Sequence, residues 1–166
     1  MRFKSSLFVT FCLACLWGSV AIAAESHQSS TFRVAAPANE VRQWIAHHTD
    51  ELTEAAGAVI VSKTETEAKI RVDDSQAGHI GYIVRRRDDG KRFTETMVKR
   101  LWGSIESYET SIVVEPSSDR ESVVKIEVSA SIENLNRIKM AAGLRRRLRG
   151  VRDTFDHQFG ITSTDD

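Results

Sequence analysis

Apolar positions along the chain follow two different periods, which divide it into helical and extended segments. From Ala38 to Ala55 they recur every three or four residues, which is typical of a helix with one buried face. Thr49 and Asp50 are polar residues at which this helix could divide in two. After Gly57 the period changes to two, which is typical of strands. The predicted strands are residues 31–36, 58–64, 68–72, 79–87, 91–100, 104–116 and 122–132.

Short turn segments separate the later strands. Asp89-Gly90 joins two of them and is a strong hairpin signal. Connections of this length place neighbouring strands antiparallel, so the sequence predicts a meander. In the last strand, apolar residues alternate with polar ones from Val124 to Ile132, so we expect one face of the sheet to be covered and the other to be wet.

A long helix is predicted at the end of the chain, from Asn134 to Phe159. Its apolar residues fall in one stripe, which we expect to pack on the apolar face of the sheet. The stripe contains Leu144, Leu148, Val151, Phe155 and Phe159.

This order of elements resembles the helix-grip fold of the START-like (SRPBCC) superfamily, which includes the polyketide cyclase/dehydrase and lipid-transport group. The local match is "RVAAPANEVRQWI", residues 33–45, where the group tends to have V-x-A-P-x-x-x-V-x-x-x-I. The resemblance implies an α+β fold in which a curved antiparallel sheet of about six to seven strands wraps around a long C-terminal helix. It also implies a cavity between the sheet and that helix, and a hydrophobic small molecule such as a lipid, sterol or aromatic compound as ligand.

The first 24 residues have the layout of a secretory signal peptide. Arg2 and Lys4 precede an apolar run that ends in small residues, with cleavage expected after Ala23 or Ala24. An uncleaved anchor is the alternative, although the run barely reaches the roughly 20 residues that span a bilayer. We therefore expect an exported protein, periplasmic or secreted. Residues 25–31 then form a polar linker, residues 32–160 the domain, and residues 161–166 a disordered tail.

Charge argues against a general nucleic-acid binder. After residue 24 the chain has 21 basic and 23 acidic side chains, a net charge of −2, whereas such binders are usually strongly basic. Basic residues nevertheless gather on the last helix. The simplest interpretation is a solvated rim beside the apolar stripe, with Arg147 on one edge, Arg145, Arg149 and Arg152 on the other, and Arg146 pointing away. The alternative is weak contact of those three edge arginines with an anionic surface.

Strand parity suggests which side chains face the expected cavity. The candidate ligand-binding residues are Tyr82, Phe93, Met97, Tyr108, Ile112 and Leu148. Glu95 and Glu106 share the parity of these residues, and a carboxyl group in an apolar pocket is suited to acid–base chemistry. Glu95, Glu106 and Tyr108 are therefore weak catalytic candidates; the alternative is that the glutamates are exposed.

Metal and cofactor sites are not expected. His47 and Glu51 have helical i, i+4 spacing, but no Cys or His cluster completes a metal site. The sequence also lacks a nucleophile elbow, a phosphate loop and a dinucleotide fingerprint.

Three functions remain open on these observations. The first is an exported, non-enzymatic binder of a hydrophobic small molecule, present as a monomer or weak dimer. The second is a cyclase- or aromatase-type enzyme that uses the cavity carboxylates. The third is a structural, envelope-associated module whose interior is filled.

Overall fold

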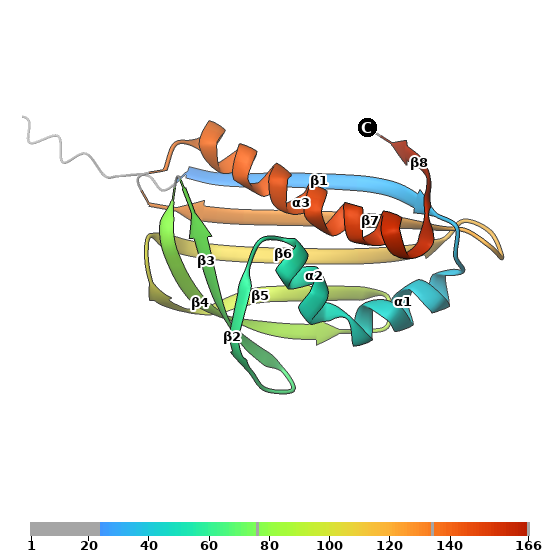
Figure 1. Ribbon diagram of the computed structural model, residues 1–166, viewed down its shortest axis with the longest axis horizontal. Helices are drawn as coiled ribbons and strands as arrows, with labels where there is room; N and C mark the ends of the chain where they lie inside the picture. Colours follow the sequence, from blue (N-terminus) through green and yellow to red (C-terminus); the bar gives the residue numbers. More distant parts are fainter. Residues whose placement is uncertain (1–23, 76, 134, 166) are drawn as a thin grey trace, which may run out of the picture.

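A computed structural model describes residues 24–75, 77–133 and 135–165, and these residues form one antiparallel sheet and three helices. The eight strands have the order β2-β3-β4-β5-β6-β7-β1-β8. The three helices lie on one face of this curved sheet (Figure 1). In chain order the elements are β1 (Ala24–Val34), α1 (Ala38–His47), α2 (Thr49–Ala55), β2 (Val59–Lys63), β3 (Glu67–Asp74), β4 (Gly78–Asp88), β5 (Arg92–Trp102), β6 (Ile105–Pro116), β7 (Ser122–Ile132), α3 (Arg137–Phe159) and β8 (Ile161–Asp165).

The predicted meander is confirmed, because β2 to β7 are neighbours in sequence order. At the predicted hairpin, Gly90 has a φ of 80°, which favours glycine. The Asp89 side chain accepts hydrogen bonds from the backbone N–H groups of Lys91 and Arg92. The α+β helix-grip architecture is therefore as predicted, but the sheet has eight strands rather than six to seven.

Both ends of the described chain differ from the prediction, since the expected linker and tail are strands. Residues 25–31 belong to β1, which pairs with β7 from Ala24↔Ile132 to Val34↔Ser122. Residues 161–165 form β8, which pairs with the end of β1. Short polar side chains such as Ser26 hide the apolar alternation there, although Ser26 is only 3% exposed. Backbone hydrogen bonds to neighbouring strands hold these segments in the sheet.

The first helical segment does divide at Thr49, giving α1 and α2. His48 separates them with a non-helical backbone (φ −118°, ψ 25°). The last helix begins at Arg137 rather than near Asn134, because the Asn136 side chain caps it by accepting hydrogen bonds from the N–H groups of Ile138 and Lys139.

The predicted stripe of α3 is buried against the sheet. Leu144, Leu148, Val151 and Phe155 are at most 8% exposed, and Phe155 packs edge-on against Phe32 of β1 at 5.6 Å between ring centres. Gly150 allows α2 to approach α3 closely. A Cβ atom there would lie 2.0 Å from the carbonyl oxygen of Ala55.

Among the described residues, no helix is long and apolar enough to cross a membrane. The expected signal peptide, residues 1–24, lies outside the described residues except for Ala24.

Candidate functional site

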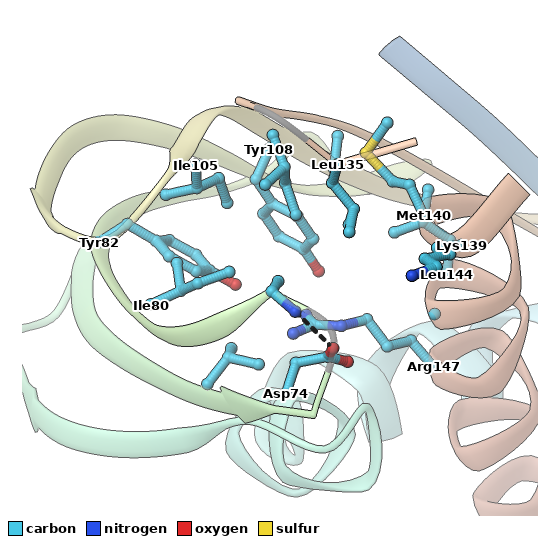
Figure 2. A pocket seen from close by; sticks show the side chains of 15 residues that line it. Asp74, Ile80, Tyr82, Ile105, Tyr108, Leu135, Lys139, Met140, Leu144 and Arg147 are labelled. Carbon is cyan, nitrogen blue, oxygen red and sulfur yellow. Dashed lines mark hydrogen bonds between the residues drawn. The ribbon is translucent and has the colours of Figure 1, made fainter. Parts of the chain in front are cut away.

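A small cavity lies between the concave face of the sheet and the first half of α3 (Figure 2). The space open to water centres is about 40 Å³. Because one water needs about 10–15 Å³ of such space, the cavity has room for roughly three. Its apolar wall comes from four strands, from α3 and from the segment before α3. That wall includes Val72, Ile80, Ile105, Ala130, Ile132, Leu135, Met140 and Leu144.

Two tyrosines occupy the interior side of the cavity, and they are the only two in the chain. Tyr82 on β4 is 1% exposed and Tyr108 on β6 is 8% exposed. Their ring centres are 5.3 Å apart. Burial raises the pKa of both hydroxyl groups, so both are neutral at physiological pH.

Arg147 brings a positive charge to the same place. Its side chain extends from α3 towards the two tyrosines (Figure 2). The guanidinium group lies beside the hydroxyls of Tyr82 and Tyr108, and its central carbon lies 5.7 Å from the centre of the Tyr108 ring. Burial acts to lower the pKa of Arg147, but the tyrosine oxygens outweigh it and raise the pKa, so the group stays charged. We call these three residues the tyrosine–arginine cluster.

A second polar network lies where α2 meets β4 and β5. Arg86 donates from Nε to Glu95 Oε1 at 2.8 Å and from a terminal nitrogen to Asp50 Oδ1 at 2.6 Å. Thr53 Oγ1 donates to the same Glu95 oxygen at 3.0 Å. Lys63 also pairs with Asp50. We call Asp50, Thr53, Arg86 and Glu95 the α2 network.

The two carboxyl groups of this network differ in burial. Glu95 is 4% exposed, and burial raises its pKa despite the opposing effects of Arg86 and Thr53. Burial also acts on Asp50, but Lys63 and Arg86 outweigh it and lower the pKa of Asp50. The network therefore holds a buried carboxyl that already has hydrogen-bond donors.

Tyr108 separates the first cavity from a second, smaller one of about 30 Å³ beside the α2 network. Phe93, Glu95 and Ile112 line that second space, together with Tyr108. Of the predicted ligand-binding residues, Tyr82 and Tyr108 thus face the first cavity, whereas Phe93, Ile112 and Tyr108 face the second. Leu148 is 6% exposed and lies in the core, outside the linings of both cavities.

Glu106 and Met97 lie elsewhere. Glu106 is exposed and accepts a hydrogen bond from Ser131 Oγ at 2.9 Å on the outer face of the sheet. A register shift between Ile105 and Ser107 turns the start of β6, so parity counted from Tyr108 is wrong at Glu106. Met97 is half-buried and borders a surface hollow beside Glu106, not either interior cavity.

Sequence reasoning missed the arginines of both clusters. The sequence pattern predicts Arg147 in the solvated rim and gives no indication of a role for Arg86. The available signal was that Arg147 lies on the edge of the apolar stripe opposite the other flanking arginines. The exposed Arg145, Arg146 and Arg149 do fit a solvated rim.

Within the part of the chain that the structure describes, no group of three or more His, Cys, Asp or Glu residues could hold a metal ion. His47 and His48 instead hydrogen-bond through Nδ1 to backbone carbonyls one turn earlier, at 2.7 Å and 2.8 Å. His48 also stacks on Trp44, with 4.8 Å between ring centres.

No protein-family model and no curated protein sequence matches the chain. Solved structures do match. A START superfamily protein from Mycobacterium smegmatis superposes with a TM-score of 0.61 at 10% identity, covering 80% of this chain and 95% of that one. The chain has the START-like helix-grip fold.

Two further neighbours are similar to this helix-grip chain. The ZhuI aromatase/cyclase from Streptomyces sp. R1128 has a TM-score of 0.57 at 14% identity, covering 81% of this chain and 96% of that one. A truncated norcoclaurine synthase from Thalictrum flavum has a TM-score of 0.54 at 16% identity, covering 80% and 92%. At these identities the likeness shows the fold alone.

Proposed function

We propose that this helix-grip chain binds a small, largely apolar molecule, without catalysis, in the cavity between the sheet and α3. The observation that carries the proposal is a cavity with apolar walls and a tyrosine–arginine cluster at one side. Ligand sites commonly combine an apolar lining with a few polar groups that fix orientation. The fold shared with a START superfamily protein is consistent with this function.

The cavity must enlarge to accept a ligand, because its present space suits about three waters. The cavity can enlarge towards a surface groove. This groove, with about 410 Å³ open to water centres, shares Val72, Asp74, Gly143 and Arg147 with the cavity. Movement of the Arg147 side chain would therefore join the two spaces.

A cavity-filling variant tests the proposal. Ala130 lies on the cavity wall and is 2% exposed, so Ala130→Leu adds three carbons to a very small space. We expect the wild type to bind the uncharged fluorophore 1-aminoanthracene, with increased emission, and Ala130→Leu to bind it at least about tenfold more weakly.

Ala68→Leu is the matched control, because Ala68 is 1% exposed on β3 but lines neither interior cavity. It should lose stability through overpacking and still bind the fluorophore. Equal binding by the wild type and Ala130→Leu would contradict the proposed location.

The small volume of the cavity also favours a second candidate function, a structural module with a filled interior. The two candidates differ in one result. A filled interior predicts that wild-type protein takes up no apolar probe, and that it carries no small molecule in native mass spectrometry when purified from its own host.

We further propose that the protein is exported after removal of its first 23 or 24 residues. The basic start and apolar run support this. β1 begins at Ala24, so cleavage after Ala23 would leave every described element whole. Sequencing the amino terminus of protein recovered from the periplasm or medium should give Ala24 or Glu25, and a terminus at Met1 would overturn this proposal.

A further inference from the structure

We infer that the ligand carries a carboxylate, which binds the tyrosine–arginine cluster while its apolar part occupies the cavity. This inference rests on the proposed binding function and names the chemical class of ligand. It begins from the hydrogen-bonding capacity of three side chains, Tyr82, Tyr108 and Arg147.

The tyrosine–arginine cluster has more donors than acceptors. A guanidinium group has five N–H donors and no acceptor, and each tyrosine has one O–H donor. The guanidinium group attracts the nearby tyrosine oxygens and repels their hydroxyl hydrogens, which are therefore able to donate elsewhere. A ligand that complements this cluster therefore presents acceptors, and a carboxylate presents two oxygens in the geometry that a guanidinium group matches.

The charges around the cavity favour an anion as well. Besides Arg147, the charged residues of its lining are Lys139 on α3 and Asp74 at the end of β3. Asp74 accepts the backbone N–H of Ala77 at 3.0 Å (Figure 2). Since both tyrosines are neutral, two positive charges and one negative charge line the cavity. A carboxylate would bring this set of charges to neutrality.

The groove outside the cavity has a mixed lining. Arg146, Arg147 and Arg149 border it together with Asp73, Asp74 and Asp153, so the preference for an anion comes from the cavity itself. Gly143 lies between groove and cavity, and a Cβ atom there would meet only Asp74 Oδ2, at 3.9 Å. The absence of a side chain at Gly143 thus leaves space beside Arg147, on the basic side of the helix.

A pair of ligands that differ only in the head group tests the inference. Octanoate and octanol have the same chain length, so the ratio of their dissociation constants measures the contribution of the carboxylate. By isothermal titration calorimetry we expect wild-type protein to bind octanoate at least about tenfold more tightly, because hydrogen bonds to charged groups are stronger than those between neutral groups.

Arg147→Met should remove the preference. Binding of octanoate should weaken at least about tenfold, whereas binding of octanol should stay within about threefold. Arg147→Lys keeps the charge and should retain part of the preference. Arg146→Met is the matched control, because Arg146 is the exposed neighbour of Arg147 on α3, and it should keep the wild-type ratio. A purely structural role for Arg147 would change stability and leave the ratio unchanged.

Tyr108→Phe provides a second measurement if Arg147→Met fails to fold. It removes one donor without a charge, so octanoate binding should weaken about threefold to tenfold with octanol binding unchanged. Equal binding of octanoate and octanol by the wild type would overturn the inference and leave the proposed function standing. Failure to bind either compound, together with no uptake of 1-aminoanthracene, would overturn both.

Discussion

Two arginines point into the concave side of the same sheet, and their surroundings differ. Arg86 contacts two carboxylates and a threonine hydroxyl, all of them in the α2 network. Arg147 contacts two neutral tyrosines beside a cavity that continues into a surface groove. The Arg86 side chain is 11% exposed and that of Glu95 is 5% exposed, so their ion pair is almost dry.

This difference separates a structural contact from a candidate binding site. Arg86 forms ion pairs with Asp50 and Glu95, and these contacts join α2 to β4 and β5. The Arg147 charge faces the neutral tyrosine hydroxyls and a cavity whose lining also includes Asp74, and a ligand could add contacts there. Comparing variants at the two positions therefore tests both assignments.

The largest expected effect is that of Arg86→Met on stability. It leaves the buried Glu95 carboxylate without its cation, which typically costs about 3–5 kcal/mol. Urea denaturation at pH 7 measures this loss. Arg85→Met is the control, because the neighbouring Arg85 pairs with Glu67 at the surface, with 48% and 36% of the side chains exposed, and should change stability by less than about 1 kcal/mol. A loss below 1 kcal/mol for Arg86→Met would remove the structural role of the α2 network.

Alkaline pH should affect the tyrosine–arginine cluster next most strongly. The folded-state pKa values of Tyr82 and Tyr108 are raised above the unfolded value, so their contribution to stability is complete below about pH 10 and is lost above it. At pH 11 the loss should be about 1.4 kcal/mol for Tyr108, and Tyr82 should add a loss of the same sign.

Absorbance at 295 nm reports tyrosinate directly, and the chain has only these two tyrosines. Between pH 9 and pH 11 it should rise only as the protein unfolds, and Tyr108→Phe should halve the final change. Titration of either tyrosine near pH 10 in protein that circular dichroism shows to be folded would contradict its burial.

Arg147→Met should cost less than Arg86→Met, about 1–2 kcal/mol in urea denaturation. The tyrosine hydroxyls beside it are neutral, and the cavity has room for water to hydrate them when the guanidinium group is removed. A loss as large as that of Arg86→Met would make the tyrosine–arginine cluster a structural contact of the same kind.

Charge reversal of Arg146, the exposed neighbour of Arg147, should have the smallest effect. Arg146→Glu should change the free energy of unfolding by less than about 0.5 kcal/mol, as ordinary surface substitutions do. At physiological salt we expect neither the wild type nor Arg146→Glu to bind anionic liposomes, because the domain has a net negative charge. Tight, salt-sensitive binding by the wild type would revive the anionic-surface alternative.

The fold was predictable because a helix or strand with one buried face needs apolar residues at regular spacing. Apolar and polar residues alternate from Val124 to Ile132, and the apolar residues of α3 recur at helical spacing, so the sequence predicted both elements. The first part of β1, residues 24–30, and β8 were missed because their short polar side chains carry little of the period, while backbone pairing holds them in the sheet.

The candidate site was less predictable, because it depends on contacts between distant elements. Strand alternation correctly predicted that Tyr82 and Tyr108 face inward. It failed for Glu106, because one irregularity in β6 reverses which residues face inward. In the sequence alone, Arg147 cannot be distinguished from the exposed arginines beside it. Only the arrangement of α3 over the sheet shows that it reaches the tyrosines (Figure 2).

The position of β1 has a consequence for the order of folding during synthesis. β1 is made before the other described elements, yet its neighbours in the sheet are β7 and β8, which are made late or last. Its pairing with β7 closes a loop of more than half of the domain, from Val34 to Ser122, and such distant contacts form slowly. The meander from β2 to β7 can pair as it emerges, whereas β1 must wait. The sheet is therefore completed only when almost the entire chain is available.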